Sequence, residues 1–371
     1  MKLTIERVVL LKALSHVQSV VERRNTIPIL SNLKLDAGDG KLSLNATDMD
    51  LDIIDSVGAE ISTPGATTAP AHTLYDIVRK LPEGAQVEMN ADGEGWLQLS
   101  SGRSRFTLSC LPIDDFPVLS GGELAHEFTL TVAEVKALVD KTKFAISTEE
   151  TRYYLNGIYV HAAERNGAQV LRAVATDGHR LASVEIPLPD GASGIPGVIV
   201  PRKTVSELRK LVDETTADIA VGLSETKIRF SFEDTVLTSK LIDGTFPDYQ
   251  RVIPEGNDKK LDVETKGFAA AVDRVSAISS EKSRAVKLNI ASGILTLSAS
   301  SPEDGSATEE IEVDYQGDVL EVGFNAGYLL DIVRQIEGSN ARMLMADAAS
   351  PTIFSEVDDP SVLYVLMPMR V

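Results

Sequence analysis

The sequence predicts an α+β protein built from three copies of one domain, because three kinds of segment recur along it. An alternating strand leads into an amphipathic helix at residues 3–21, 128–142 and 261–278. A second helix follows a short polar or proline-containing link at residues 69–81, 200–212 and 324–336. A Phe-Pro pair recurs at residues 116–117 and 246–247. All offsets lie between 124 and 133 residues, so the segments are in register, as in a repeat protein.

The best-defined helix start is in the central copy. Phe128 and Leu130 alternate with polar residues as in a strand, and Thr131 with Glu134 then has the spacing of a capping box. Each copy is expected to hold two helices among strands. The predicted helices are 6–24, 71–80, 131–143, 201–213, 264–274 and 326–337, and the predicted domains are 1–122, 123–254 and 255–371, with Gly121-Gly122 as the first linker.

Strands of the first copy are predicted at residues 32–35, 41–45, 48–54, 85–89, 96–100 and 104–110, bounded by turn residues such as those at 37–40. Cys110 is the only cysteine, which excludes an intramolecular disulfide and a thiolate metal site, and we expect it to be a buried strand residue. No apolar run approaches the length of a membrane span and the first residues lack a secretory signal, so we expect a cytoplasmic protein.

The net charge of −19 argues at first against a nucleic-acid partner. The predicted helices, however, hold more basic than acidic residues, and the remainder of the chain carries the acidic excess. Two interpretations stay open: the helices face phosphate, or the acidic surface only keeps the protein soluble. Arg23 and Arg24 have the same ambiguity, because they could close the first helix or contact phosphate.

Two patches of the central copy could bind ligands. In residues 152–157 an arginine precedes Tyr153 and Tyr154, which could stack on bases or could form a strand with one ring buried. In residues 175–181, Asp177-Gly178 predicts a turn between strands with His179 and Arg180 at its edge.

Asp177 and His179 together also suggest an enzyme, but the sequence has no nucleophile motif, zinc motif or phosphate-binding glycine loop. We therefore expect no catalytic residues, no metal site and no cofactor.

The chain ends in an apolar run, 364–371, rich in methionine. Such an end is either paired into a sheet or lines a groove that accepts several partners.

These same motifs, together with Phe246-Pro247-Asp248-Tyr249 and Met367-Pro368-Met369-Arg370-Val371, resemble the bacterial sliding clamp family, the beta subunits of DNA polymerase III. The resemblance covers essentially the whole chain. It implies a head-to-tail homodimer that forms a six-domain ring around duplex DNA without sequence specificity. It also implies a processivity factor with no catalysis of its own, which tethers the polymerase III alpha subunit, the clamp loader and other polymerases and repair proteins through short linear motifs.

The resemblance assigns three sets of residues. The partner-peptide pocket would use Leu155, Thr176, Gly178, His179, Arg180, Leu181, Pro247, Arg251, Val252, Asn325, Tyr328, Val365, Leu366, Met367, Pro368 and Met369. DNA contacts would involve Arg24, Arg152, Tyr153, Tyr154 and Arg202. The dimer contact would pair the edge strand holding Phe106 and Leu108 with the third-domain helix holding Ile278.

Three places depart from the family pattern: His72-Thr73 stands where two basic residues are expected, Ser283 where an aromatic residue is expected, and Pro351 where a serine is usual. These departures leave two questions open: whether His72 contacts DNA, and which partner motifs the pocket prefers in detail. A third hypothesis, a monomeric peptide-binding scaffold, would use the Leu155/Met367 groove without DNA. Only the clamp hypothesis accounts for the triplicate domain, the basic helices and the groove together.

Overall fold

The computed structural model describes all residues except 120–121, 280–283 and 371, and the chain divides into two compact units. The first unit comprises residues 1–135, 189–196 and 203–241, and the second comprises residues 136–188, 197–202 and 242–371. The predicted central repeat is therefore shared between the two units.

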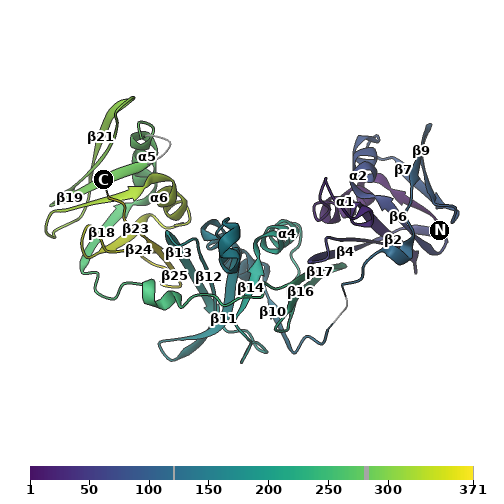
Figure 1. Cartoon of the computed structure of the whole chain (residues 1–371), viewed down its shortest axis with the longest axis horizontal. Coiled ribbons are helices and arrows are strands. Elements are labelled where there is room, and N and C mark those ends of the chain that lie inside the picture. The colour runs from purple at the N-terminus through teal and green to yellow at the C-terminus, as the bar shows by residue number, and fades with distance from the viewer. Residues whose placement is uncertain (120–121, 280–283, 371) are drawn as a thin grey trace. The chain divides into compact units, whose positions relative to one another are not determined.

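The first unit contains two antiparallel sheets and the helix pair α1 (Arg7–Val17) and α2 (Ala71–Lys80), which pack against each other (Figure 1). The smaller sheet has the order β5 (Glu60–Thr63), β1 (Lys2–Glu6), β7 (Gln86–Ala91), β8 (Trp96–Ser101), β9 (Ser104–Ser109). The larger has the order β10 (His126–Leu130), β15 (Ile219–Leu223), β16 (Lys227–Phe232), β17 (Thr235–Lys240), β4 (Leu51–Gly58), β3 (Lys41–Thr47), β2 (Asn32–Gly38), β6 (Gly65–Pro70). Helix α4 (Arg202–Val212) belongs to this unit except for its first residue, whereas α3 (Val132–Asp140) is divided between the two units.

The second unit has the same plan, with α5 (Thr265–Ser276) packed on α6 (Ala326–Val333) (Figure 1). Its larger sheet has the order β14 (Val198–Pro201), β11 (Gly157–Arg165), β12 (Ala168–Thr176), β13 (Arg180–Pro187), β25 (Val362–Leu366), β24 (Thr352–Glu356), β23 (Asn340–Met345), β18 (Lys259–Glu264). Its smaller sheet has the order β21 (Gly305–Glu312), β20 (Ile294–Ser301), β19 (Ala285–Ala291), β22 (Leu320–Asn325).

Each eight-stranded sheet takes strands from two repeats that are adjacent in the sequence. In the first unit β17 pairs with β4, and Leu237 lies opposite Ile53. In the second unit β25 pairs with β13, and Tyr364 lies opposite Ala182. The two junctions join equivalent strands, since β17 and β25 are each the last strand of a repeat and β4 and β13 each follow the second hairpin strand. We call these pairings the repeat junctions.

The predicted helices are all present, and the prediction for 71–80 matches α2 at both ends. The prediction for the first helix was wrong at its end, because α1 stops at Val17 and turns follow. Val20 and Val21 stay buried and prolong the apolar period, which made the helix look longer than it is. Arg23 and Arg24 lie in this irregular segment and so do not close the helix.

Local predictions in the central repeat were mixed. The capping box is confirmed: Thr131 Oγ1 accepts from the Glu134 backbone N–H, and Glu134 accepts from the Thr131 backbone N–H at 2.8 Å. The strand interpretation of the two tyrosines was wrong, since Glu150–Leu155 forms the 3-10 helix η4. Cys110 lies just after β9 and is only half-buried, because the strand ends at Ser109.

Two buried polar groups stand out in the first unit. The imidazole of His16 on α1 lies between two carboxylates, with Nδ1 2.7 Å from Asp55 and Nε2 3.1 Å from Glu214. Asp55 also accepts a hydrogen bond from Thr235. Burial lowers the pKa of His16, but the hydrogen bonds to Asp55 and Glu214 outweigh it and leave this pKa raised. Residues of two repeats thus meet around one histidine.

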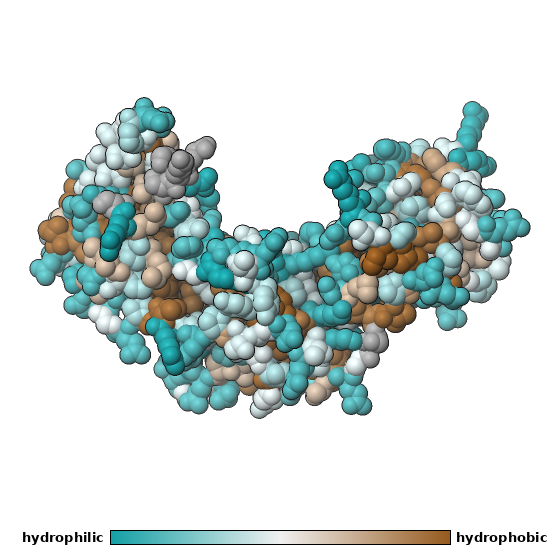
Figure 2. Space-filling view, in the orientation of Figure 1, coloured by the Kyte–Doolittle hydropathy of each residue, from teal (hydrophilic) through white to brown (hydrophobic). Residues whose placement is uncertain are grey.

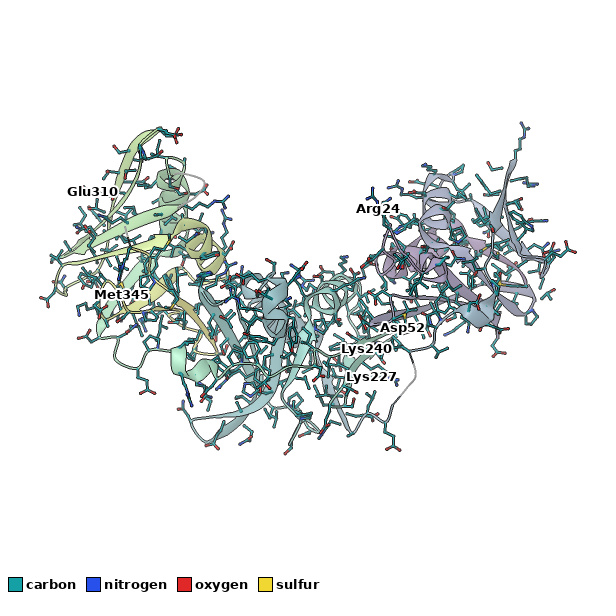
Figure 3. The ribbon with its side chains drawn as sticks, in the orientation of Figure 1. Arg24, Asp52, Lys227, Lys240, Glu310 and Met345 are labelled. Carbon is teal, nitrogen blue, oxygen red and sulfur yellow. The ribbon has the colours of Figure 1, made fainter. Side chains whose placement is uncertain are left out.

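The second group is Asp52 on β4, labelled in Figure 3, whose side chain is buried beside Asn45. Burial raises the pKa of this carboxyl to about 6, against a hydrogen bond from Asn45 that lowers it. One oxygen of each side chain has no hydrogen-bond partner among the described residues. Ionisation of Asp52 therefore destabilises the folded protein.

Candidate functional site

The larger sheet of the second unit carries an apolar cluster near the β13–β25 junction. Strands β12, β13, β14 and β25 supply its floor, and residues after β17 cover it. Figure 2 shows apolar side chains gathered where Figure 1 draws the β25 end of this sheet. The buried members are Leu155, Val174, Leu181, Ile199, Phe246, Tyr249 and Val365, and the half-buried ones include Tyr154, Ile242, Ile253 and Leu363.

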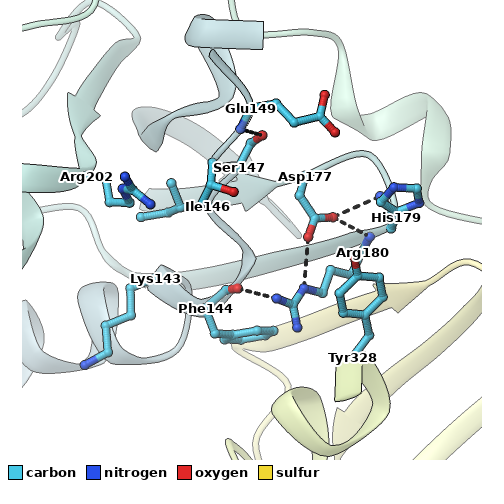
Figure 4. A pocket seen from close by; sticks show the side chains of 11 residues that line it. Lys143, Phe144, Ile146, Ser147, Glu149, Asp177, His179, Arg180, Arg202 and Tyr328 are labelled. Atoms are coloured by element: carbon cyan, nitrogen blue, oxygen red, sulfur yellow. Dashed lines mark hydrogen bonds and ion pairs between the residues drawn. The ribbon is translucent and has the colours of Figure 1, made fainter. Parts of the chain in front are cut away.

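Arg180, at the start of β13, organises the polar region beside this cluster (Figure 4). Its guanidinium bonds Asp177 at 3.1 Å, Asp331 of α6 at 2.5 Å and the Phe144 carbonyl at 2.7 Å. Its central carbon also lies 4.4 Å from the centre of the Tyr328 ring, within cation–π range. Arg180 therefore links strand β13 to helix α6 and fixes both.

The turn before Arg180 is shaped by short side chains. Thr176 Oγ1 donates to the Arg180 carbonyl and accepts from the Gly178 backbone N–H. Gly178 has a φ of +87°, in the left-handed region that glycine favours, and a Cβ there would lie 2.6 Å from an Arg152 nitrogen. The predicted Asp-Gly turn is thus confirmed, and no other residue fits at Gly178 without displacing Arg152.

The C-terminal segment completes the region. The Met367 backbone N–H donates to the His179 carbonyl, and the Met369 N–H donates to the Gly323 carbonyl. The His179 ring stacks on Tyr328 at 5.8 Å between ring centres. The end of the chain is therefore paired with its neighbours, while the Met367 side chain stays 42% exposed.

A cavity of about 400 Å³ opens beside Arg180. Figure 4 shows Arg202 and Lys143 on one side of it and Tyr328 of α6 on the other. Its lining residues are Lys143, Phe144, Ile146, Ser147, Thr148, Glu149, Asp177, His179, Arg180, Arg202 and Tyr328. The lining combines Lys143, Arg180 and Arg202 with the carboxylates of Glu149 and Asp177, so the cavity suits a polar ligand.

The predicted pocket residues all lie in the second unit, on or next to these features. Leu155, Leu181 and Val365 belong to the apolar cluster. Pro247 and Val252 flank its members Phe246, Tyr249 and Ile253, and exposed Arg251 pairs with Asp248 at 2.7 Å. Asn325 caps α6 by accepting from the Tyr328 N–H at 3.1 Å. The remaining members are Thr176, Gly178, His179, Arg180, Leu366, Met367, Pro368 and Met369, on the β12–β13 turn and the C-terminal segment.

Sequence reasoning missed the residues that hold the site in place. Phe246 and Tyr249 belong to the Phe246-Pro247-Asp248-Tyr249 motif but were not predicted as pocket residues, and the structure buries both in the apolar cluster. No sequence pattern indicates the roles of Phe144 and Asp331, because both act by contacting Arg180, which is distant from them in the sequence.

The predicted DNA-contact residues differ in their freedom to bind phosphate. Arg24, labelled in Figure 3, and Arg202 are exposed. Arg152 instead makes two hydrogen bonds to Glu149, at 2.7 and 2.5 Å, and these lower the pKa of that carboxyl. Tyr153 is 53% exposed and meets Tyr154 edge-on at 5.7 Å. Arg152 would have to leave Glu149 before it could contact a phosphate.

The predicted dimer residues lie on an edge strand of the first unit and in a turn of the second. Phe106 is half-buried and Leu108 buried on β9, which is an edge strand of the first unit. The placement of Ile278 in a helix was wrong, because α5 ends at Ser276 and Ile278 lies in the turn that follows. Half-buried Ile278 continues the apolar period of α5 past the true end, as Val20 and Val21 do after α1.

The departures from the family pattern have separate outcomes. His72 donates from Nε2 to the Val21 carbonyl at 2.8 Å, so its ring is occupied by the backbone. The Pro351 carbonyl accepts from the Asn257 side chain at 2.9 Å. Ser283 lies outside the described residues.

Within the described ranges, no group of three or more His, Cys, Asp or Glu residues is placed to hold a metal ion. No helix in those ranges is both long and apolar enough to span a membrane.

Family models for the DNA polymerase III beta subunit match nearly the whole chain. The N-terminal domain model matches residues 1–120, the central domain model 129–248 and the C-terminal domain model 250–370. The beta sliding clamp of Caulobacter vibrioides is 57% identical over 372 residues, with both chains covered completely. The chain belongs to the beta sliding clamp family.

Solved clamp structures agree. A Caulobacter crescentus beta sliding clamp with bound polyethylene glycol is 57% identical, with a TM-score of 0.98 over 100% of this chain and 99% of that one. A Bartonella birtlesii sliding clamp bound to griselimycin is 50% identical, with a TM-score of 0.97 and complete coverage of both chains. The Escherichia coli beta sliding clamp is 41% identical over 373 residues, again with complete coverage.

Membership in this family identifies the kind of activity. A beta sliding clamp is a non-catalytic processivity factor of DNA polymerase III. The enzyme hypothesis built on Asp177 and His179 is therefore wrong for this chain. The geometry agrees, since the Asp177 carboxylate is occupied by Arg180 and by the backbone N–H groups of His179 and Arg180.

Proposed function

We propose that this chain closes as a head-to-tail homodimer around duplex DNA in the cytoplasm and tethers replication and repair proteins to it. Its partners would be the polymerase III alpha subunit, the clamp loader, and other polymerases and repair proteins that carry short linear motifs. Domains 1–122, 123–254 and 255–371 of each subunit would form the six-domain ring. The matched family ranges and the three-fold repeat support these boundaries.

The observation that carries ring closure is the repetition of one strand pairing. The two repeat junctions join β17 to β4 and β25 to β13. By the same equivalence, the third junction would join β9, the last strand of the first repeat, to β21 of the third. Both are edge strands in this chain. An edge strand readily pairs with another chain, and a head-to-tail contact closes a ring when the rotation allows it.

The existing junctions also predict the register of the third one. Phe106 is the counterpart of Leu237, since these residues lie opposite Leu99 and Phe230 in equivalent hairpins. Ala307 is the counterpart of Ile53 and of Ala182. Because Leu237 lies opposite Ile53 and Tyr364 lies opposite Ala182, Phe106 should lie opposite Ala307 of the partner subunit.

Charge supports this pairing. Arg103 and Arg105 lie at the exposed β9 end of the first unit. The proposed register places exposed Glu310 of the partner subunit's β21 opposite Arg103. Opposite charges across an interface favour the correct partner and speed its association.

The register predicts a disulfide. In a Cys110→Ser background, Arg105→Cys with Thr308→Cys puts two exposed thiols directly opposite each other across the proposed junction. Opposed residues in a sheet have Cβ atoms about 5 Å apart, which a disulfide can bridge. Mild oxidation should convert most of the protein to a covalent dimer on non-reducing gels. Arg105→Cys with Glu310→Cys, displaced by two residues, should cross-link far less; equal cross-linking of both pairs would contradict the register.

The partner pocket is proposed to be the apolar cluster together with the surface formed by His179, Tyr328 and Met367. An apolar groove beside a few fixed polar groups suits a short peptide with one or two apolar anchors. The griselimycin complexes of the Bartonella birtlesii and Pseudomonas aeruginosa clamps support a ligand site in relatives that share this fold. The exposed methionine would adapt to partners of different sequence.

Met367→Ala should weaken the binding of a labelled polymerase III alpha-subunit peptide about tenfold, because it removes an exposed, deformable contact surface. Fluorescence anisotropy would measure the affinity. The melting temperature should change little, since the side chain is 42% exposed. Val319→Ala, also an exposed apolar residue of the second unit, is the matched control. Unchanged affinity in Met367→Ala would count against this pocket.

DNA contact is proposed through Arg24, Arg152, Tyr153, Tyr154 and Arg202. Phosphate contacts of this kind carry no sequence information and would let the ring slide.

The decisive experiment for the whole proposal loads the protein onto nicked circular plasmid with a clamp loader and isolates the complex by gel filtration. Linearisation with a single-cut nuclease should release the protein, because a ring leaves through a free end. Retention on the linear DNA would indicate ordinary electrostatic binding. No association with the circle would favour the monomeric peptide-binding scaffold.

A further inference from the structure

A second cavity of about 400 Å³ lies on the smaller sheet of the second unit and shares no lining residue with the cavity beside Arg180. It is bounded by β19, β20, β21 and the C-terminal segment. Its lining residues are Ala285, Lys287, Ser298, Ala299, Ser300, Ser306, Ala307, Thr308, Met369 and Arg370. We call this cavity the terminal groove.

The terminal groove is positively charged, although the chain as a whole is negatively charged. The protein has a net charge of −19, yet the groove lining holds two cations, four hydroxyl side chains and no carboxylate. Arg370 is exposed and makes no ion pair with any residue that the structure describes. Lys287 pairs with Glu321 at 3.1 Å but remains one-third exposed. This combination suits an anionic ligand.

Strand register arranges these groups in a line. Lys287 lies opposite Ser298, and Ser298 lies opposite Thr308, so one row crosses three strands. Ser300 and Ser306 form the neighbouring row. Buried Leu288 and Leu297 alternate with these positions, which places the polar row on the face away from the apolar core.

The terminal groove also adjoins the proposed partner pocket. Met367 binds the β12–β13 turn through its backbone, and Met369 binds β22 two residues later. Arg370 is three residues beyond Met367, a span of about 10 Å in extended chain. A peptide held against Met367 therefore needs only about three more residues to reach Arg370 and Lys287.

We infer that the terminal groove binds an acidic segment that flanks the pocket-binding motif of a partner protein, through Lys287, Arg370 and the hydroxyls between them. The inference rests on the proposed peptide pocket. In the proposed dimer, Arg105 of the partner subunit would lie opposite Thr308 and extend the same row with a third cation. Partners whose motif is followed or preceded by Asp or Glu would then bind more tightly than their motif alone predicts.

The test compares three labelled forms of one polymerase III alpha-subunit peptide: unextended, extended by three glutamates, and extended by three serines, with each extension placed at either end in turn. For the full-length dimer in low salt, glutamates at one end should tighten binding about fivefold, and serines should leave it unchanged. The gain should disappear in about 0.5 M salt, where exposed charges are screened.

Variants identify the site. The gain from glutamates should be lost in the double variant Lys287→Gln/Arg370→Gln, while the unextended peptide should bind that variant as it binds the unmodified protein. Lys266→Gln, an exposed lysine of the same unit outside the groove, should keep the gain. The inference is overturned if glutamates give no gain, or if the gain persists in the double variant. If the unextended peptide binds neither protein, the proposed function fails, and this inference fails with it.

Discussion

Replacing His16 by alanine is expected to destabilise the first compact unit by about 3 kcal/mol near pH 6. The imidazole is 10% exposed and lies within hydrogen-bond distance of both Asp55 and Glu214. Removing it leaves the Asp55 carboxylate buried with Thr235 as its remaining side-chain donor. An uncompensated buried charge is more costly than the absence of the whole pair.

The pH dependence of this effect follows from the raised pKa of His16. Protonation favours the folded state, so the stabilisation is complete below the unfolded value of 6.5 and is lost as the pH rises through the folded pKa. The cost of His16→Ala should therefore shrink between pH 6 and pH 9.

Urea unfolding followed by tryptophan fluorescence suits this measurement, because the single tryptophan, Trp96, lies in β8 of the same unit. Lys12→Ala is the matched control. Lys12 approaches the same Glu214 at 3.7 Å, but both side chains are about half exposed, so its loss should cost less than 1 kcal/mol. Similar losses for both variants would show that the buried histidine has no special role.

Asp52→Asn should have the opposite sign and stabilise the first unit at pH 8. The folded pKa of Asp52 is about 6 and its ordinary value is 3.8, a difference of about 2 pH units, or about 3 kcal/mol. Because the folded state prefers the neutral acid, stability is complete at low pH and is lost as the pH rises through about 6. An asparagine cannot ionise, so it removes this loss.

The side-chain oxygens of Asn45 and Asp52 that lack hydrogen-bond partners also predict that Asp52→Asn is stabilising. When Asp52 is ionised, two neighbouring buried oxygens are acceptors without donors. A proton on Asp52, or the amide hydrogens of an asparagine in its place, supplies a donor that the Asn45 oxygen can accept.

The gain from Asp52→Asn should be about 3 kcal/mol at pH 8 and about half of that at pH 5, measured by the same fluorescence assay. Asp50→Asn is the control, because Asp50 is 77% exposed in the turn before β4 and should change stability little. A gain of equal size at both pH values would contradict the assigned titration of Asp52.

The sequence was sufficient to predict structural features that depend only on neighbouring residues. Period, capping and turn residues placed α2, the Thr131 capping box and the Gly178 turn, since each depends on residues within one turn of structure. It failed at the ends of α1 and α5. There Val20, Val21 and Ile278 prolong the apolar period without helical backbone, because an apolar period alone does not specify the backbone conformation.

The site was predictable to a different extent. The resemblance supplied the proposed pocket residues, but not the network of contacts around them. Arg180 depends on Phe144 and Asp331, and His16 on Glu214, through pairs separated by 36 to 198 residues. A sequence pattern indicates that such residues are buried or polar. It does not indicate which of them meet, because that depends on the register of strands from different repeats.

The sequence repeats and the compact units of the structure do not coincide, because each repeat junction pairs strands of two different repeats. A fragment cut at residues 122 and 254 would hold one complete repeat, yet β17 and β13 would each lose the neighbour that covers an edge. Open edges of this kind favour aggregation. A single repeat on its own would therefore need a second copy of itself, or another strand, to cover these edges.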